Sequence, residues 1–379
     1  MKQNTENFIR SLLNSAGVEI NGPGEADIQI HHPDFYNRVI RDGTLGFGES
    51  YMDGWWDVKK MDELMYQILY ASLDEKVNRL NTLFYYLEAL FVNYGKKSRA
   101  FEVGKKHYDI GNDLFRNMLD KRMAYSCGYW KDARNLDEAQ EAKLDLICRK
   151  LDLKPGMKVL DIGCGWGSFC KYAAEKYDVE VVGITVSKEQ VDYALADCKG
   201  LNVKIKLQDY RDLCTEISQT NENLFDRIVS VGMFEHVVYK NYRTYMKTVH
   251  SLLKENGLFL LHTIGANISV RANEPWSNKY IFPNSLVPSI KQISGSSEGL
   301  FVMEDWHNFG AHYDKTLMAW FANFDRNWDQ IKSNYDERFY RMWKFYLLSS
   351  AGSFRARNVQ LWQIVLSKKG VINGYNTIR

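Results

Sequence analysis

Two kinds of hydrophobic spacing divide the chain. Over residues 64–91 apolar side chains recur every three or four positions, which is typical of amphipathic helices. From about residue 100 onward, short aliphatic and β-branched runs alternate with helical stretches. These runs predict strands at 158–162, 179–186, 203–207, 227–231, 258–263 and 361–366. Strands that alternate with helices predict an α/β fold with a parallel, doubly wound sheet and right-handed connections.

Local signals mark where elements begin and end. Asn135, with Glu138 three residues on, predicts a capped helix that runs to Leu151. Ser187 is expected to cap the helix after the second strand. Four glycines and three aromatic residues lie close together over residues 43–56 and predict a loop. The aromatic rings either pack inside the protein or contact a lipid or partner surface. The residues are Gly43, Gly46, Gly48, Gly54, Tyr51, Trp55 and Trp56.

Length and composition indicate two globular domains. The 379 residues have an average apolar content, and 6 prolines argue against a long disordered linker. We expect a helical N-terminal lipid or dimerisation domain over residues 1–93, a basic linker over 94–106 and a catalytic domain over 107–379.

The six cysteines show no C-x-x-C pair, so we expect reduced thiols and no metal site. No signal peptide or membrane-spanning run is visible, and a cytoplasmic location is expected.

Charge narrows the choice of partners. The net charge is +2, without a continuous basic stripe, which argues against a nucleic-acid partner. The basic linker is either a solvated face or a contact with an anionic surface. From residue 338 onward the chain has no Asp or Glu and eight basic residues, so we expect this segment to meet an anionic bilayer surface, or Arg355 and Arg357 to hold a lipid phosphate. The eight are Arg338, Arg341, Lys344, Arg355, Arg357, Lys368, Lys369 and Arg379.

A glycine turn carries the strongest chemical signal. The segment DIGCGWG (161–167) follows a predicted strand and precedes a helix, so backbone N–H groups would face a ligand. A dinucleotide site would have glycine at Ser168 and an acid at Thr185. Asp161 instead suits a ligand with an amino group and a positive sulfonium. The turn therefore predicts S-adenosylmethionine, with a purely structural turn as the alternative.

Several long motifs resemble one branch of the class I methyltransferases, the cyclopropane fatty acid synthases. They are GESYMDGWW (48–56), HYDIGNDLF (107–115), YSCGYW (125–130), VGMFEH (231–236), WHNFG (306–310) and FRAR (354–357). The resemblance covers nearly the whole chain. It implies a mostly parallel seven-stranded methyltransferase sheet, a small mainly helical N-terminal domain and a homodimer on the inner face of the cell membrane.

The resemblance also implies residue roles. S-adenosylmethionine would be bound by Tyr125, Ser126, Asp161, Gly163, Gly165, Thr185, Gln190, Gln208 and Asp209. A catalytic bicarbonate would be held by Cys127, Glu235, His262, Ile264 (through its backbone) and Tyr313. Two further histidines, His236 and His307, are expected to be structural. Ser350 stands where many relatives have cysteine, and we expect it to line the site without covalent chemistry.

The implied reaction adds a methylene group across a cis double bond in a phospholipid acyl chain. The alkene attacks the sulfonium methyl, and a base then removes a methyl proton so that the ring closes. This chemistry demands a dry pocket, ring faces near the cation and a fixed base. Two rival hypotheses remain: a methyltransferase for a small amine, thiol or hydroxyl, and a lipid- or partner-binding protein without catalysis.

Overall fold

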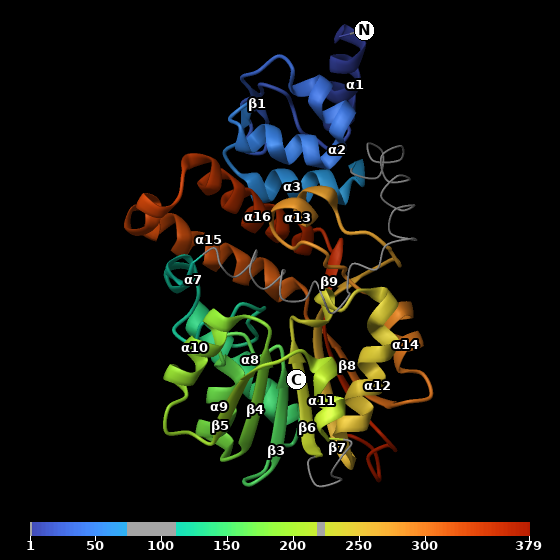
Figure 1. Ribbon diagram of the computed structural model, residues 1–379. Helices are drawn as coiled ribbons and strands as arrows, with labels where there is room; N and C mark the ends of the chain where they lie inside the picture. The colour runs from blue at the N-terminus through green and yellow to red at the C-terminus, as the bar shows by residue number, and fades with distance from the viewer. Residues whose placement is uncertain (1, 74–110, 218–223) are drawn as a thin grey trace. The chain divides into compact units, whose positions relative to one another are not determined.

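The structure, a computed structural model, describes residues 2–73, 111–217 and 224–379 (Figure 1). They form two compact units. The helical unit contains Met1–Val92, Arg271–Pro283 and Tyr313–Val359. The sheet unit contains Asn93–Val270, Asn284–His312 and Gln360–Arg379. The basic linker (94–106) lies outside the described residues, so the predicted division at 93 and 106 stays a prediction.

The sheet unit contains a seven-stranded sheet in the order β5-β4-β3-β6-β7-β9-β8. Its five neighbouring strands from β5 to β7 pair in parallel, and β8 pairs antiparallel with β9. The predicted α/β class and mostly parallel seven-stranded sheet are therefore confirmed. The strands are β3 (Lys158–Ile162), β4 (Glu180–Thr185), β5 (Val203–Leu207), β6 (Phe225–Val231), β7 (Leu253–Ala266), β8 (Val302–Asn308) and β9 (Val359–Ser367).

Hydrophobic side chains cover both faces of this sheet. Val159 belongs to one buried cluster and its neighbour Leu160 to another, because successive strand residues point to opposite faces. The first cluster includes residues of α8 (Leu136–Lys150), α9 (Ser168–Tyr177) and α10 (Lys188–Asp197). The second includes residues of α11 (Tyr210–Ile217), α12 (Tyr242–Leu252) and α14 (Ile290–Ser297). The short helix α7 (Asn112–Met118) also belongs to this unit.

Both predicted helix caps are present. The side chain of Asn135 accepts a hydrogen bond from the N–H of Glu138 at 2.9 Å, at the start of α8. Ser187 accepts from the N–H of Gln190 at the start of α10. These bonds satisfy N–H groups that a first helical turn leaves unpaired. They fix the residues at which the two helices begin.

The helical unit is built from packed helices and one small two-stranded antiparallel sheet. Its long C-terminal helix α16 (Glu337–Arg355) packs against α3 (Met61–Tyr70) and α2 (Phe35–Met52). A Cβ on Gly352 would lie 2.6 Å from a main-chain oxygen of α3, so glycine permits the close approach. The remaining elements are α1 (Lys2–Asn14), β1 (Gln29–Ile30), β2 (Trp56–Asp57), α13 (Pro275–Tyr280) and α15 (Ala311–Ile331).

The glycine-rich segment around residue 46 differs from the prediction. It is not a loop, because α2 continues through Gly46 and Gly48 with a kink at Gly43. A Cβ on Gly48 would lie 2.4 Å from the Trp276 ring, so the glycine makes room for an indole. The rings of Tyr51 and Trp56 are buried, which confirms that they pack inside the protein.

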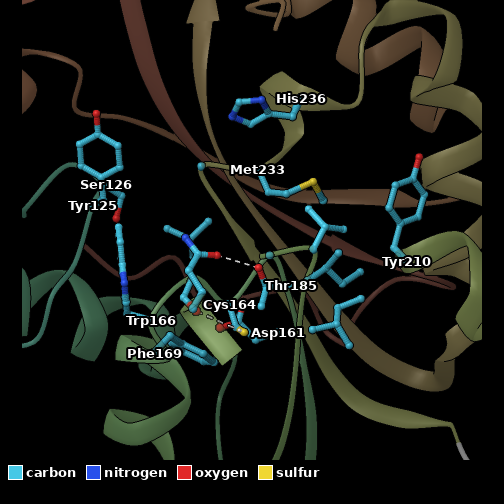
Figure 2. Close-up of a pocket in the computed structure, with 18 of the residues that line it drawn as sticks. Tyr125, Ser126, Asp161, Cys164, Trp166, Phe169, Thr185, Tyr210, Met233 and His236 are labelled. Atoms are coloured by element: carbon cyan, nitrogen blue, oxygen red, sulfur yellow. Dashed lines mark hydrogen bonds between the residues drawn. The ribbon is translucent and has the colours of Figure 1, made fainter. Parts of the chain in front are cut away.

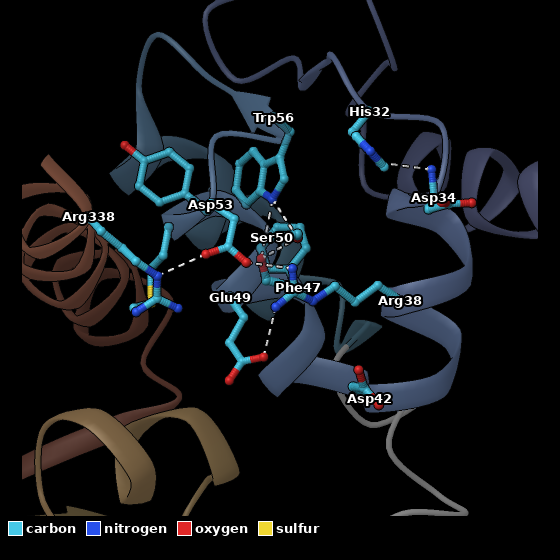
Figure 3. Close-up of polar contacts among 12 residues, drawn as sticks. His32, Asp34, Arg38, Asp42, Phe47, Glu49, Ser50, Asp53, Trp56 and Arg338 are labelled. Carbon is cyan, nitrogen blue, oxygen red and sulfur yellow. Dashed lines mark hydrogen bonds and ion pairs between the residues drawn. The ribbon is translucent and has the colours of Figure 1, made fainter.

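A polar cluster ties together segments of the helical unit that lie far apart in the sequence (Figure 3). Glu49 accepts hydrogen bonds from Arg38, Lys279 and Tyr280 at 2.9, 2.6 and 2.8 Å. Burial opposes ionisation, but the bonds from Lys279, Tyr280 and Arg38 hold the Glu49 pKa at about 2. Nearby, Asp53 bridges Arg38 and Arg338. The insertion at 271–283 is thereby joined to α2.

Most basic side chains of the C-terminal segment are neutralised by acids that lie in the same unit as the cation. Arg355 contacts three carboxylates, those of Asp62, Glu63 and Asp314, at 2.8–3.2 Å. Six of the eight basic side chains pair with a carboxylate: Arg338, Arg341, Arg355, Lys368, Lys369 and Arg379. Most of these cations thus already have a carboxylate partner within the protein, and contact of the segment with a bilayer stays a prediction. In the parts of the chain that the structure describes, no helix has the length and apolar character needed to span a membrane.

Candidate cofactor and catalytic site

A pocket opens where β3, β4 and β6 end, at the carboxyl edge of the sheet (Figure 2). Ligands of open α/β sheets bind at this edge. All nine predicted cofactor residues line it: Tyr125, Ser126, Asp161, Gly163, Gly165, Thr185, Gln190, Gln208 and Asp209. The structure thus brings together residues spread over more than eighty positions of sequence, while their role in binding a cofactor remains a proposal.

The glycine turn needs its glycines. Gly163, Gly165 and Gly167 have φ values of 87°, 55° and 84°, which residues other than glycine rarely adopt. A Cβ on Gly163 would also lie 2.6 Å from the Met233 side chain. The main-chain N–H groups of Gly163 and Cys164 donate to the carbonyl of Ile184 and hold the turn against β4.

Asp161 lies at the end of β3 beneath this turn, and its side chain is 2% exposed. One carboxylate oxygen accepts from the thiol of Cys170 at 3.4 Å. The other, Oδ1, is buried and has no hydrogen-bond partner among the described residues. Burial raises the Asp161 pKa to about 7, although the bond from Cys170 and the charge of Lys143 lower it. A ligand ammonium would satisfy this oxygen.

The other side of the pocket carries the predicted ribose and adenine residues. Thr185 donates from its hydroxyl to Oε1 of Gln190 at 2.7 Å, which leaves the Gln190 amide N–H groups as donors. Asp209 is buried, and the guanidinium of Arg211 holds its two oxygens at 2.7 and 2.6 Å. Thr185 is therefore fixed in orientation, and Asp209 is already ion-paired.

Glu235 is the central residue of the predicted catalytic group. It follows β6 in a short 3-10 helix, and its side chain is buried. Oε1 accepts from the main-chain N–H of Ile264 at 2.7 Å, and Oε2 has no partner in the described part of the chain. Burial raises the Glu235 pKa to about 7, against the hydrogen bond from Ile264.

His262 lies on the neighbouring strand β7, in register with Val231 of β6. Its side chain is buried, and Nδ1 lies 3.2 Å from Nε2 of Gln363. Nε2 of the ring has no partner in the described residues. Burial first, then the charges of Lys143 and Lys150, lower the His262 pKa well below its usual value, so the ring is neutral.

The remaining predicted catalytic residues lie in different places. Cys127 is fully buried in the sheet unit, directly after the pocket residue Ser126, with its thiol 3.2 Å from the carbonyl of Gly128. Tyr313 belongs to the helical unit, where its ring packs against Trp320 and Phe354. Ser350 also belongs to the helical unit, on α16. The roles of all three remain predictions.

Three further residues were not predicted to take part. His236 lines the pocket next to Met233, although it was expected to be structural; its position directly after Glu235 was a signal (Figure 2). Lys143 also lines the pocket, and its ammonium donates to the hydroxyl of Ser126 at 2.8 Å. Gln363 orients His262 from β9. Lys143 and Gln363 carried no sequence signal, because each lies alone within an ordinary helix or strand pattern.

Comparisons with known proteins show the family of this chain. The mycolic acid cyclopropane synthetase family model matches residues 95–364. The chain is 54% identical over 369 residues to cyclopropane-fatty-acyl-phospholipid synthase of Escherichia coli K12, covering 97% of this chain and 94% of that protein. It is 37% identical over 281 residues to cyclopropane mycolic acid synthase 1 of Mycobacterium tuberculosis H37Rv, covering 69% of this chain and 95% of the relative.

Solved structures support the same assignment. Mycolic acid cyclopropane synthase CmaA1, in complex with SAH and CTAB, matches with a TM-score of 0.64 and 33% identity, over 71% of this chain and 98% of that one. A coclaurine N-methyltransferase, at 20% identity and a TM-score of 0.68, shares the fold, over 86% of this chain and 99% of that one. The predicted resemblance is confirmed: this chain is an S-adenosylmethionine-dependent methyltransferase of the cyclopropane synthase family.

Proposed function

We propose that this enzyme transfers a methylene group from S-adenosylmethionine to the cis double bond of an unsaturated acyl chain in a membrane phospholipid, giving a cyclopropane ring. The observation that carries the proposal is the 54% identity, across 97% of the chain, to a cyclopropane-fatty-acyl-phospholipid synthase. The likeness to coclaurine N-methyltransferase, at 20% identity, extends to the fold alone and does not favour the rival methylation of a small amine.

The proposed reaction forms two bonds to one carbon. The alkene π electrons attack the sulfonium methyl, the sulfur–carbon bond breaks, and S-adenosylhomocysteine leaves. The resulting carbocation loses a proton from the new methyl group, and that C–H electron pair closes the ring. The protein must exclude water from the cation and hold a proton acceptor near the methyl carbon.

We assign the donor to the pocket at the ends of β3 and β4. The turn at Gly163 and Gly165, with Asp161 below it, would hold the methionine part, and Tyr125 and Ser126 would close over it. Thr185 and Gln190 would bind the ribose, and Gln208 and Asp209 would lie by the adenine. The shared lining of one pocket supports these roles.

The proton acceptor is proposed to be a bicarbonate held by Cys127, Glu235, His262, Ile264 and Tyr313. When bound, it would supply a base that accepts the methyl proton. Two buried atoms suit such an anion, Oε2 of Glu235 and Nε2 of His262, since both lack partners among the described residues. The carboxyl of Glu235 can exchange a proton with it, and the neutral His262 ring can donate to it if Nε2 carries its proton. The N–H of Ile264 is already bonded to Glu235, so Ile264 would act mainly by fixing that carboxylate.

The lipid substrate requires the enzyme to reach a bilayer. We therefore propose that it acts at the inner face of the cell membrane as a peripheral protein and as a homodimer. Because most C-terminal cations are already paired with carboxylates, we infer that other parts of the chain supply most of the attraction to the lipid.

The test uses the purified full chain with vesicles of unsaturated phospholipid and S-adenosylmethionine. We expect each modified acyl chain to gain one CH2 unit and to lose its double bond. Glu235→Gln, carried through the same assay, should form little product while still binding S-adenosylhomocysteine. Unchanged lipid with the wild-type enzyme, together with methylation of an added amine or thiol, would support the small-molecule alternative.

A further inference from the structure

Lys143 is a buried cation inside the donor pocket. It lies on α8, its side chain is 1% exposed, and it lines the pocket. Its one hydrogen bond to the described residues is the 2.8 Å bond to the hydroxyl oxygen of Ser126. A lysine ammonium has three N–H donors, so two remain without an acceptor. Because burying unsatisfied donors of a cation is costly, this arrangement indicates that a ligand supplies the missing acceptors.

A buried carboxylate faces the same pocket. Oδ1 of Asp161 is an acceptor without a partner in the described part of the chain. Lys143 and Asp161 are close enough for each charge to shift the pKa of the other. The pocket therefore presents one cation with spare donors and one carboxyl with a spare acceptor, which is complementary to the α-ammonium and α-carboxylate groups of an amino acid.

We propose that Lys143 binds the α-carboxylate of the methionine part of S-adenosylmethionine, while Asp161 receives the α-ammonium. This inference rests on the proposed function, because it names the part of the donor that each group recognises. Ser126 joins the same contact. Its oxygen accepts from Lys143, so its O–H is available to donate to the ligand carboxylate.

The ionisation of the pocket agrees with this geometry. Burial lowers the Lys143 pKa to about 8, and the carboxylates of Asp120 and Asp161 act against that shift. A ligand carboxylate beside the ammonium would also oppose this lowering of the Lys143 pKa and keep Lys143 charged in the complex. Binding of the zwitterion would thus satisfy both buried groups at once.

A second lysine on the same helix provides the contrast. Lys150 is also fully buried, but its ammonium lies 3.3 Å from Asp305 and 3.1 Å from Nδ1 of His307. Lys150 does not line the pocket. Its charge is therefore neutralised within the protein, and Lys150 is the matched control for removing a buried lysine from α8.

The experiment measures binding by calorimetry with the full chain and two ligands, S-adenosylhomocysteine and its decarboxylated form. We expect the wild type to bind S-adenosylhomocysteine about 10- to 100-fold more tightly, the range for a hydrogen bond to a charged group. Lys143→Met should lose most of this preference, and Lys150→Met should retain it. Circular dichroism and thermal melting of each variant establish that it is folded.

Three results would overturn the proposal. The first is equal affinity of the wild type for the two ligands, which needs no variant at all. The second is a folded Lys143→Met, or Lys143→Gln if the methionine variant does not fold, that keeps the full preference. The third is a Lys143 variant whose affinities for the two ligands fall by the same factor. That result would mean that Lys143 acts only by holding Ser126 in place. Failure of the wild type to bind S-adenosylhomocysteine would instead contradict the donor assignment in the proposed function.

Discussion

The main-chain N–H of Ile264 donates to Oε1 of Glu235 at 2.7 Å and leaves Oε2 buried without a partner among the described residues. One half of the carboxylate is thereby fixed by the backbone of β7, and the other half remains to interact with a ligand. A carboxyl group placed in this way has an orientation set by the fold and a proton affinity set by burial. It can bind and exchange a proton in a fixed direction.

Glu235→Gln should abolish most turnover and yet stabilise the protein above neutral pH. Burial raises the folded-state pKa of Glu235 from 4.5 to about 7, so ionisation above pH 4.5 favours the unfolded chain. This penalty is absent below pH 4.5 and complete above about pH 7. At pH 8 the glutamine variant should gain about 2–3 kcal/mol in the free energy of unfolding, measured with urea. At pH 4 the two proteins should unfold alike.

An exposed glutamate serves as the control for that change. Glu298→Gln should shift neither turnover nor the pH dependence of unfolding, because its side chain is exposed. Equal stability of wild type and Glu235→Gln at pH 8 would show that the carboxyl is not held in a desolvated site.

Gln363→Leu should slow turnover without weakening donor binding. The Gln363 amide bonds to Nδ1 of His262 and thus selects which ring nitrogen carries the proton. Loss of such an orienting partner typically costs about 10- to 100-fold, and we expect kcat to fall by about that factor. The Kd for S-adenosylhomocysteine should change less than about twofold, since Gln363 does not line the donor pocket.

Gln360→Leu is the matched control, because Gln360 is a buried glutamine on the same strand that bonds to Asn308 and Asn267. Nitrogen NMR of His262 should show a change of tautomer or ring hydrogen bonding in Gln363→Leu alone. An unchanged His262 spectrum with reduced kcat would mean that Gln363 acts by packing.

Donor affinity should depend on pH with a maximum slightly above neutrality. Protonation of Asp161, whose pKa is raised to about 7 by burial, removes the acceptor for the ligand ammonium below that pH. Deprotonation of Lys143, whose pKa burial lowers to about 8, removes the charge that faces the ligand carboxylate above it. Calorimetry with S-adenosylhomocysteine should show both limbs, and Lys143→Met should lack the alkaline limb. Affinity that stays constant from acid to alkaline pH would contradict both assignments.

Arg355→Met should destabilise the protein and leave vesicle binding nearly unchanged. Removing the guanidinium leaves three clustered carboxylates, those of Asp62, Glu63 and Asp314, without their shared partner. We expect a loss of about 1–3 kcal/mol in the free energy of unfolding. Flotation with anionic vesicles at several salt concentrations measures the second effect. A large drop in vesicle binding by a folded variant would restore the lipid-phosphate role considered for Arg355.

The sheet was largely predictable from its hydrophobic runs, but its edge was not. The strand Lys158–Ile162 was predicted with its observed bounds, because a buried parallel strand is a continuous apolar run. The edge strand Val302–Asn308 was missed, since most of its side chains are at least partly exposed and its sequence, VMEDWHN, has no regular alternation of apolar and polar residues. Pairing with β9 decides its structure, and that pairing is not visible in a local pattern.

The site was predictable where a motif marks it. Asp161 and the glycines lie in a short segment whose spacing reflects a backbone requirement, so the sequence alone indicates the ligand. In the sequence, Lys143 looks like any lysine of a helix. Its ammonium is buried beside Ser126 only because α8 packs against the sheet. The partners of Arg355 lie far away along the chain, so its ion pairs could not be predicted from the local run of basic residues.

The proposed reaction leaves a methylene unit, rather than a methyl group, on the lipid. The most direct measurement is mass spectrometry of an unsaturated phospholipid after reaction with the purified enzyme and S-adenosylmethionine that carries a trideuterated methyl group. We expect a product that retains two of the three deuterium atoms and resists hydrogenation. A product that retains all three, or a lipid that stays unmodified while the donor is consumed on another acceptor, would contradict the proposed reaction.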